Sequence, residues 1–388
     1  MRHTSLNKEA DLHGKQSEWP VETKDLERVG REVNEASESG ETFFAYRLPE
    51  SETVFLGRDA ASIDEIVIPN SFNIYSFDGS FYTSLVKKVE KAKDNGGYED
   101  STKIKTAGKF PHSNSDTLPE STLKTTHEKN VRTIVKELNE AGGGKCVLSR
   151  VKTGLCLRSP GENFVELCRK KRSAFVFCYF TPQSGLWIGA TPETLLRGHD
   201  GKLFTMALAG TRKNGSSGKW DAKNIEEQQI VTHFIADKLA ENGLKPIISP
   251  LFTKNAGPVE HLCQHIEAQL PDDDHSSEIA IASVASLLKS LSPTPALGGY
   301  PRENALRLIS SLEDHDRGCY GGFCGLFHNV SDFNLFVNLR SARLIPISDG
   351  ISGNRWMYVK YCGGGITRFS NPEDEWIETE IKSTSLDL

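Results

Sequence analysis

Residues 174–191 read AFVFCYFTPQSGLWIGAT, two apolar runs separated by a short polar turn. Each run has the length of a β-strand, is rich in aromatic and β-branched residues, and is bounded by turn-forming residues. Further strands are predicted at 145–151, 202–209, 318–328, 333–345 and 355–362. Many of these strands follow one another with only a short turn between them, which predicts largely antiparallel sheets. The fold class is therefore α+β, and a doubly wound parallel sheet is excluded.

Helices are predicted between and after these strands. Val131, Ile134, Val135 and Leu138 recur at helical spacing before three glycines, and the remaining helices are predicted at 222–241, 279–290, 302–313 and 372–383. Residues 1–40 are polar and weakly patterned, which predicts a weakly ordered N-terminal segment. Residues 95–121 are rich in Gly, Ser, Asp, Lys and Pro, and we expect a surface loop there.

The composition excludes several classes of protein. Among 388 residues, 46 Lys and Arg against 52 Asp and Glu give a formal charge of −6, which argues against nucleic-acid binding. No apolar run approaches the ~20 residues that cross a bilayer, and the N-terminus lacks the pattern of a signal peptide. The eight cysteines form no CxxC pair, and several lie in apolar runs, which indicates reduced, buried thiols. We expect a cytoplasmic protein without membrane or nucleic-acid partners.

Two of the predicted helices carry carboxylates where apolar side chains are expected. Glu227 precedes Val231 by four residues and so projects from the inward face of the helix at 222–241. Glu375, Glu378 and Lys382 line one stripe of the helix at 372–383. An unpaired buried charge is very costly, so these groups need partners. Salt bridges and a solvated charged face are one interpretation, and oxygen ligands suited to Mg²⁺ are the other.

Three motifs that suggest other chemistry do not satisfy its requirements. Residues 142–145 follow a helix and precede a strand, the reverse of a phosphate-binding loop, and Cys146 stands where Ser or Thr is required. The glycines at 363–365 lack the spacing of a dinucleotide fingerprint, although they would let a ligand approach the backbone closely. His261 and His265 could bind zinc on a helix, but the residues between them lack the glutamate of HExxH.

Ten short motifs occur in one order along most of the chain. They are GKCVLSR (144–150), GATPETLL (189–196), ALAGT (207–211), KNIEEQQIV (223–231), VEHL (259–262), SPTPALGGYP (292–301), EDHDRGCYGGFCG (313–325), VNLRSA (337–342), YCGGGIT (361–367) and NPEDEWIETEIK (371–382). Each motif alone is weak, but the series resembles the chorismate-utilising enzymes, the family of anthranilate synthase component I.

The resemblance implies a fold, a substrate and a metal. It implies a single large chorismate-binding domain over 41–388, in which two packed, mainly antiparallel sheets have helices outside. It also implies Mg²⁺ as the cofactor and chorismate as the substrate, and we expect a monomer without a glutamine amidotransferase subunit. The pattern is most similar to the isochorismate synthases. Salicylate synthase, anthranilate synthase component I and a non-catalytic chorismate-binding subunit are the alternatives.

The resemblance also assigns roles residue by residue. Lys145 matches the general base that acts on the attacking water, and Glu193 matches the general acid that protonates the departing C4 hydroxyl. To hold its proton, Glu193 must have a raised pKa. Glu227 and Glu378 match magnesium ligands, with Glu375 close by. The positions that match substrate contacts are Gly210, Thr211, His261, Ala296, Leu297, Arg340, Tyr361, Gly363, Gly364 and Lys382.

One further position separates the activities within the family. Ala209 stands where aminodeoxychorismate synthases carry a nucleophilic lysine. The resemblance therefore argues against aminodeoxychorismate synthase activity.

Overall fold

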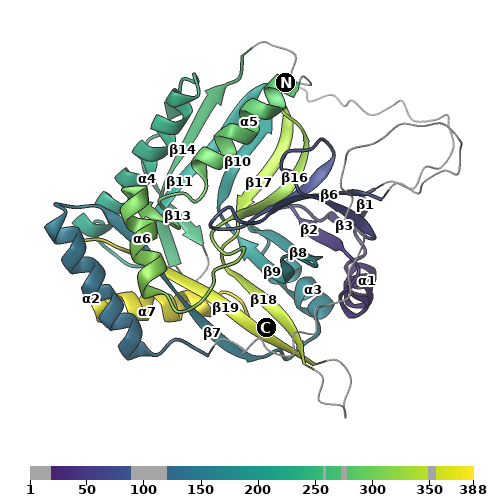
Figure 1. The fold of residues 1–388 in the computed structure, drawn as a ribbon, viewed down its shortest axis with the longest axis horizontal. Coiled ribbons are helices and arrows are strands. Elements are labelled where there is room, and N and C mark those ends of the chain that lie inside the picture. Colours follow the sequence, from purple (N-terminus) through teal and green to yellow (C-terminus); the bar gives the residue numbers. More distant parts are fainter. Residues whose placement is uncertain (1–18, 89–119, 257–258, 272–277, 348–354) are drawn as a thin grey trace, which may run out of the picture.

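The computed structural model describes residues 19–88, 120–256, 259–271, 278–347 and 355–388 (Figure 1). In this part of the chain the strands form two sheets, and all the strand pairings within them are antiparallel. No helix of the described residues is long and apolar enough to span a membrane.

The nine-stranded sheet has the order β1 (Val21–Thr23), β3 (Val54–Gly57), β2 (Phe43–Arg47), β8 (Phe175–Thr181), β9 (Gly185–Thr191), β18 (Ser341–Ile347), β19 (Arg355–Ile366), β7 (Lys145–Leu155) and β15 (Gly299–Tyr300). The ten-stranded sheet has the order β12 (Ile247–Ile248), β14 (Val259–Gln269), β11 (Lys202–Lys213), β10 (Thr194–His199), β17 (Asp332–Val337), β16 (Phe323–Asn329), β5 (Ser71–Tyr75), β6 (Tyr82–Lys87) and β4 (Ala60–Ile63), with β13 (Phe252–Ala256) also paired to β14. The helices of the described residues are α1 (Leu26–Ser39), α2 (Lys124–Glu140), α3 (Pro160–Lys170), α4 (Ala222–Glu241), α5 (Glu278–Leu291), α6 (Arg302–Leu312) and α7 (Pro372–Ser383).

The two sheets pack against each other through aromatic side chains. Phe175 of β8 stacks on Phe336 of β17 with ring centroids 4.1 Å apart, and Phe44 of β2 stacks on Phe72 of β5 at 4.7 Å. All four rings are buried in one apolar cluster that draws on both sheets. Stacked aromatic pairs of this kind add to the large apolar area that each ring buries. The main core therefore lies between the sheets, as the resemblance implies.

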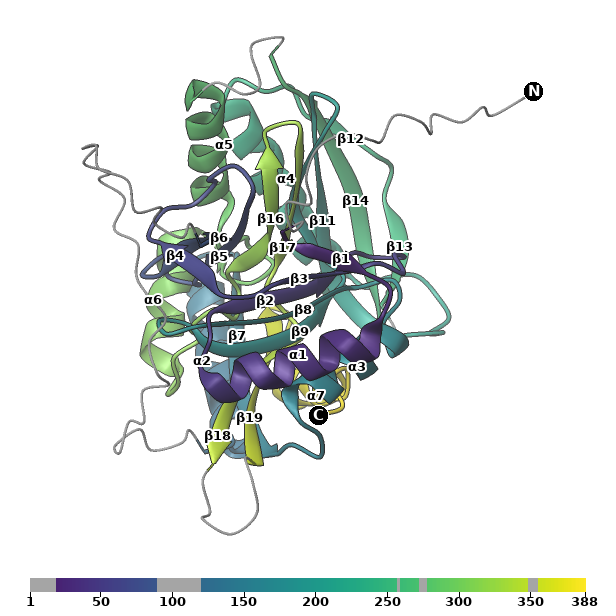
Figure 2. The ribbon, with the colours of Figure 1, turned by 90° about the vertical axis from the view of Figure 1, so that its right-hand side faces the viewer.

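Helices cover the outer surfaces of the sheets (Figures 1 and 2). Helices α1 and α3 pack together beneath the nine-stranded sheet, where Val33 and Phe164 join an apolar cluster with the outward side chains of β2, β8 and β9. Helices α2 and α6 pack on β7 through a third cluster, which includes Ile134 and Leu308. Helix α4 packs on β11 and β14.

The structure corrects the predicted limits of several segments. Residues 21–39 are not weakly ordered: β1 pairs with β3, and α1 buries Val29, Val33 and Ala36. The ordered domain therefore begins before residue 41. Residues 1–18, and residues 95–119 of the predicted loop at 95–121, lie outside the described residues. The predicted strand at 318–328 begins only at Phe323.

The most consequential correction concerns residues 333–345, which form two strands in different sheets. Strand β17 belongs to the ten-stranded sheet and β18 to the nine-stranded sheet, so the chain changes sheets at residues 338–340. Residues 259–269, in which a helical histidine pair was considered, form β14. His261 is buried there and His265 is exposed, so the pair does not form the helical zinc site.

Candidate active site

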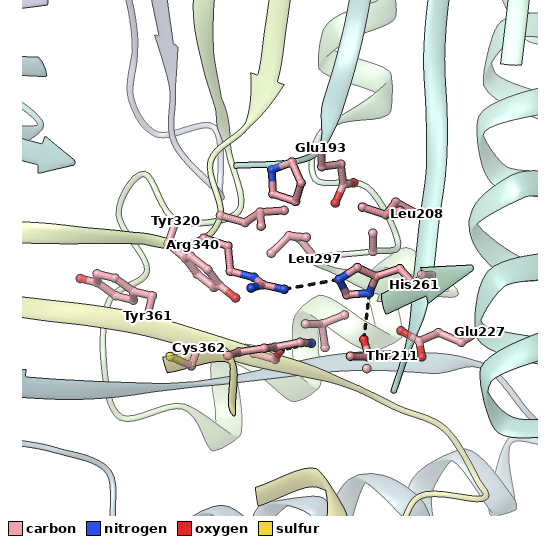
Figure 3. Close-up of a pocket in the computed structure, with 18 residues that line it drawn as sticks. Glu193, Leu208, Thr211, Glu227, His261, Leu297, Tyr320, Arg340, Tyr361 and Cys362 are labelled. Atoms are coloured by element: carbon pink, nitrogen blue, oxygen red, sulfur yellow. Dashed lines mark hydrogen bonds between the residues drawn. The ribbon is translucent and has the colours of Figure 1, made fainter. Parts of the chain in front are cut away.

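A cavity with about 620 Å³ of space, counting its opening to solvent, is lined by residues from both sheets and from α4 and α7 (Figure 3). The lining consists of Val147, Pro192, Glu193, Leu208, Ala209, Thr211, Glu227, His261, Ala296, Leu297, Tyr320, Leu339, Arg340, Tyr361, Cys362, Gly363, Gly365 and Lys382. A concave site with apolar walls and a few converging charged groups is the usual form of a small-molecule site.

Arg340 reaches the cavity at the point where the chain changes sheets. Its backbone φ is 50°, in the left-handed region that residues other than glycine seldom occupy. Such a conformation costs about 1–3 kcal/mol and is concentrated at functional sites. The crossover therefore places a buried guanidinium at the wall of the cavity, where it can form two parallel hydrogen bonds to a carboxylate.

His261 of β14 orients the Arg340 guanidinium. Its Nδ1 lies 3.0 Å from the Gly210 carbonyl oxygen and 3.2 Å from Thr211 Oγ1, and its Nε2 lies 3.4 Å from Arg340 Nη2 (Figure 3). A carbonyl oxygen can only accept, so Nδ1 carries the ring proton and Nε2 accepts from Arg340. Burial, reinforced by the charge of Arg340, lowers the pKa of His261 to about 3. The His261 ring is therefore neutral. It fixes the position of the Arg340 guanidinium but does not itself attract an anion.

A bulge in β11 brings Thr211 to the cavity. The register against β14 shifts between Ala209 and Thr211, and Gly210 at the shift has a φ of 69°. A side chain at this residue would lie 3.0 Å from the Asn224 carbonyl oxygen. Glycine is required because the left-handed backbone and the close approach of α4 both exclude a side chain. Asn224 Oδ1 accepts a hydrogen bond from Thr211 N at 2.7 Å and so ties the bulge to α4.

Glu193 lies in the short link between β9 and β10, and its side chain points into the cavity (Figure 3). It is 4% exposed, and in the described residues no hydrogen bond or ion pair to its carboxyl oxygens is seen. Burial raises the pKa of Glu193 to about 8, although Lys145, Lys254, Lys382 and Arg340 act in the opposite direction. Glu193 therefore holds a proton at neutral pH, as a general acid must.

Lys145 begins β7 and is completely buried. Its Nζ lies 2.8 Å from Glu227 Oε1 on α4. The pair fits because Gly365 of the neighbouring strand β19 has no side chain: a Cβ there would lie 2.2 Å from Glu227 Oε1 and 2.8 Å from Lys145 Cε. Lys145 is therefore not a surface lysine at the edge of a strand, and the Glu227 carboxylate meets both this lysine and the cavity.

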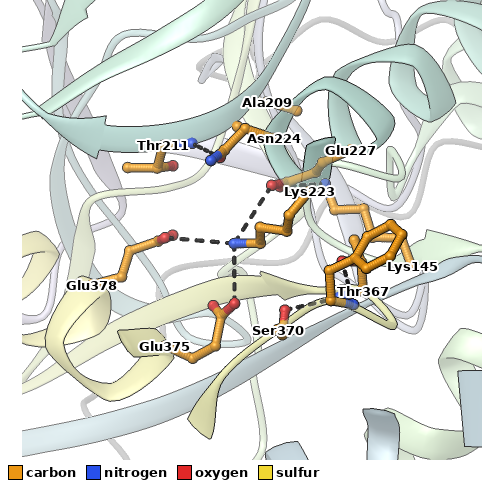
Figure 4. Close-up of polar contacts among 12 residues, drawn as sticks. Lys145, Ala209, Thr211, Lys223, Asn224, Glu227, Thr367, Ser370, Glu375 and Glu378 are labelled. Carbon is orange, nitrogen blue, oxygen red and sulfur yellow. Dashed lines mark hydrogen bonds and ion pairs between the residues drawn. The ribbon is translucent and has the colours of Figure 1, made fainter. Parts of the chain in front are cut away.

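A cluster of three carboxylates lies beside the cavity, around the ammonium group of Lys223 (Figure 4). Lys223 Nζ is 3.0 Å from Glu375 Oε1, 3.8 Å from Glu378 Oε2 and 4.0 Å from Glu227 Oε2. We call Glu227, Glu375 and Glu378 the carboxylate cluster. Its members come from α4 and α7, and Lys382 also pairs with Glu378 Oε1 at 2.7 Å.

The members of the carboxylate cluster differ in their affinity for protons. Burial would raise the pKa of Glu378, but Lys382 and Lys223 outweigh it and lower the value. Burial raises the pKa of Glu375, with the charge of Glu378 adding to the effect and Lys223 opposing it. For Lys223, burial is outweighed by the carboxylates, which raise the pKa of the ammonium group. The cluster thus holds a cation at its centre.

The structure brings the residues selected from the sequence together in one place. Those that line the cavity are Glu193, Thr211, Glu227, His261, Ala296, Leu297, Arg340, Tyr361, Gly363 and Lys382. Lys145, Gly210, Gly364, Glu375 and Glu378 lie directly behind the lining, in contact with Glu227, His261, Glu375 or Lys223. The spacing of Glu227 in the sequence allows a salt bridge or a metal ligand, and in this structure Glu227 forms a salt bridge with Lys145.

Sequence reasoning missed several residues of the site. The lining residues that it did not select are Val147, Pro192, Leu208, Tyr320, Leu339, Cys362 and Gly365, and Lys223 of the carboxylate cluster was also missed. Lys223 stands four residues before Glu227, the spacing of a helical ion pair, and this signal was available in the sequence. Tyr320 stacks on Tyr361 with ring centroids 5.4 Å apart. This contact joins residues that are distant in the sequence, so no local sequence pattern predicts it.

The motif EDHDRG (313–318) builds one wall of the cavity without lining it. Arg317 is buried, pairs with Glu313, and donates to the carbonyl oxygens of Leu297 and Val147 at 2.8 and 2.6 Å. Glu313 in turn accepts from Ser149 N at 2.6 Å. A buried charge pair that satisfies backbone groups fixes their positions, so Arg317 holds two lining residues in place.

Comparison with known proteins places the chain in a family. The family model described as chorismate binding enzyme matches residues 64–387. The chain belongs to that family. It is 30% identical over 293 residues to isochorismate synthase MenF of Escherichia coli, covering 69% of this chain and 63% of that protein. It is 25% identical to anthranilate synthase component 1 of Saccharolobus solfataricus, covering 69% and 62%.

The chorismate-binding fold extends over most of the chain. The solved structure of MenF, the menaquinone-specific isochorismate synthase from Escherichia coli, matches with a TM-score of 0.68 and 22% identity, covering 93% of this chain and 90% of that one. At this identity the likeness concerns the fold. In sequence, the chain aligns with about half the length of the curated relatives it matches.

Proposed function

We propose that the chain is a Mg²⁺-dependent isochorismate synthase that adds water at C2 of chorismate and releases the C4 hydroxyl as water. The observation that carries the proposal is the position of Glu193, which is buried and lines the cavity. Its buried carboxyl group faces the cavity with a pKa raised to about 8, and so is poised to protonate a departing hydroxyl. Chorismate carries two carboxylates, and Arg340 and Lys382 supply two cationic groups on the same cavity.

Lys145 is the base in this proposal. A lysine can accept a proton from water only in its neutral form. Lys145 Nζ lies 2.8 Å from Glu227 Oε1, so Lys145 must first give up a proton before it can take one from the attacking water. The base, Lys145, lies on β7 and the acid, Glu193, lies in the β9–β10 link. Lys145 can therefore take a proton from the incoming water while Glu193 gives one to the departing hydroxyl.

The side chains beside the cavity are of the chemical type that binds a divalent cation such as Mg²⁺. The carboxylate cluster offers oxygen ligands, the type that Mg²⁺ prefers, and Glu375 Oε2 is buried without a hydrogen-bond partner. The three groups already hold a cation, Lys223, at their centre. Among the described residues, however, no three acidic, histidine or cysteine side chains stand close enough together to hold a metal as they are. A bound cation would neutralise a substrate carboxylate.

The lining supplies no enzyme amine at residue 209 that could add to the ring. Ala209 of β11 lines the cavity and presents only a methyl group. The relatives named as anthranilate synthase component 1 show that the family includes other activities, so the product must be identified directly.

The test is incubation of the purified chain with chorismate and Mg²⁺ in ¹⁸O-labelled water, followed by chromatographic separation and mass spectrometry. We expect isochorismate with the label on its C2 hydroxyl. Salicylate with pyruvate as the final product would mean that isochorismate is formed and then cleaved. Anthranilate in the presence of ammonia, or chorismate that binds but is never converted, would contradict the proposal.

Lys145→Ala tests the assigned base. We expect turnover to fall by roughly 10²–10⁴-fold, the usual contribution of a positioned general base. Chorismate binding should change much less, because Arg340 and Lys382 remain in place. The two quantities are measured by steady-state kinetics and by calorimetric titration with chorismate. Turnover close to that of the wild type would remove Lys145 from the mechanism.

A further inference from the structure

Lys223 occupies the position that a cation bound to the carboxylate cluster would take (Figure 4). The ammonium nitrogen lies within 4.0 Å of one oxygen from each of Glu227, Glu375 and Glu378. The other oxygens of Glu227 and Glu378 are engaged by Lys145 and Lys382. Lys223 is thus the one lysine of the described residues that contacts all three carboxylates.

A divalent cation and the Lys223 ammonium group cannot share this position. A metal bound by all three carboxylates must lie between them, where the ammonium group now lies. Direct bonds between Mg²⁺ and carboxylate oxygens are about 2.0–2.1 Å long, so the carboxylates would have to move closer together to bind it. Three carboxylates already face three lysines, and adding a doubly charged ion without removing a lysine would leave the site with a large excess of positive charge. In a poorly solvated site such an excess is costly.

The position of Lys223 at the start of α4 allows its side chain to move. Lys223 is the second residue of α4, two positions after the N-cap Asp221, and its side chain is 14% exposed in contrast to the fully buried Lys145. The flexible four-carbon stem lets the ammonium group change position without movement of the helix. Glu227 stands one helical turn further along α4, so its carboxylate remains in the cluster when the lysine leaves.

We propose that Lys223 is an internal counter-ion that holds the carboxylate cluster together before metal binding and is displaced by the incoming divalent cation. This inference rests on the metal of the proposed function. Lys223 then acts as a positioning residue with two opposing effects. It prevents three buried carboxylates from repelling one another in the metal-free protein, and it competes with the metal for the same oxygens.

The first test compares Mg²⁺ binding by wild type and Lys223→Met, measured by calorimetry in the absence of chorismate. Methionine keeps much of the length of lysine and removes the charge. We expect the dissociation constant for Mg²⁺ to fall by roughly 5- to 150-fold, the range of coupling between two competing interactions. The metal-free variant should also unfold at a lower temperature than the metal-free wild type. Lys238→Met is the matched control, because it removes a lysine of the same helix that pairs with Glu241 away from the cluster.

The outcomes separate this inference from the proposed function. Equal or weaker Mg²⁺ binding by Lys223→Met overturns the displacement of Lys223 but leaves the metal site intact. Failure of both proteins to bind Mg²⁺ or Mn²⁺ overturns the metal site itself.

A second test uses the wild type alone, so it holds even if the variant does not fold. An amine-specific reagent is applied with and without Mg²⁺, and labelling of individual lysines is measured by mass spectrometry, with Lys238 as the reference. We expect Lys223 to be labelled several-fold faster once Mg²⁺ is present, because its amine leaves the cluster. Unchanged or slower labelling of Lys223 at a Mg²⁺ concentration shown to saturate the site would overturn the proposal.

Discussion

Burial decides the charge of Glu193, and the charge decides which direction of pH change inactivates it. The pKa of the side chain is raised to about 8, so the carboxyl group is protonated below that pH and loses its proton above it. A general acid works only while it holds the proton. We therefore expect kcat/KM for chorismate to fall as the pH rises through about 8.

Glu193→Gln tests the same residue by substitution. We expect turnover to fall by roughly 10²–10⁴-fold, because an amide cannot protonate the departing hydroxyl. The variant should still bind chorismate, since Arg340 and His261 are unchanged. The residual activity, measured between pH 6 and 9, should lack the decline near pH 8. A variant that retains both the rate and the decline would show that another group is the acid.

At the scale of single residues, the sequence predicted the site residues that belong to motifs. It did not predict the properties that depend on packing between distant parts of the chain. Glu193 and Arg340 were found through motifs, and the structure places both on the cavity. The burial that changes the protonation of Glu193 is created by both sheets and has no local signature. Lys223 was missed because lysine at the start of a helix is usually a solvated residue, and its partners Glu375 and Glu378 are remote in sequence.

At the scale of elements, the glycine run of β19 allows α4 and β7 to approach each other. We expect Gly365→Ala to separate Lys145 from Glu227, because its methyl group would lie 2.2 Å from Glu227 Oε1. Turnover should fall by roughly 10²-fold, the usual effect of misplacing a reacting group by about 1 Å. Gly364→Ala, whose methyl group would lie 3.0 Å from Glu375 Oε2, should have a smaller effect. Equal turnover in wild type and Gly365→Ala would show that the Lys145–Glu227 contact is not needed.

Elements with clear end signals were predicted well. Helices α4 and α7 have the predicted bounds, and Asp221 and Asn371 cap their first turns. Helix α1 was missed although Val29, Val33 and Ala36 recur at helical spacing, because charged residues dominate its composition. The division of 333–345 into β17 and β18 follows from the packing of two sheets, and a periodicity of two residues cannot reveal it.

At the scale of the whole molecule, the site exists only because two sheets and two helices converge. Glu227 on α4 and Glu378 on α7 are distant in sequence, and the Lys223 ammonium group lies within 4.0 Å of an oxygen of each. Helix α7 is held against β7 by Arg150, which donates to Thr379 Oγ1 at 2.7 Å and stacks on Trp376 at 4.1 Å. Helix α2 closes the other side of α7. The stability of this packing therefore also determines whether the carboxylate cluster forms.

His127 makes that stability depend on pH. It lies buried in α2 against the edge of Trp376, and in the described residues neither ring nitrogen has a hydrogen-bond partner. Burial, with a smaller effect of Arg150, lowers its pKa to about 4. In the unfolded chain the pKa is about 6.5, so between these values the unfolded state binds a proton that the folded state does not. The contribution of His127 to stability is therefore present above pH 6.5 and is lost as the pH falls towards 4.

At pH 5 this loss amounts to about 2 kcal/mol relative to pH 8. His127→Leu keeps an apolar side chain of similar size and removes the titration, so the variant should lose about 2 kcal/mol less than the wild type between the two pH values. Urea unfolding of both proteins at pH 8 and pH 5 measures the difference. The two proteins must be compared with each other because Glu193 also titrates in this range. Its raised pKa makes the folded state more stable as the pH falls, which opposes the effect of His127 in both proteins. If wild type and variant lose the same free energy of unfolding, the ring is already protonated in the folded state, and the packing of α2 against α7 tolerates a buried charge.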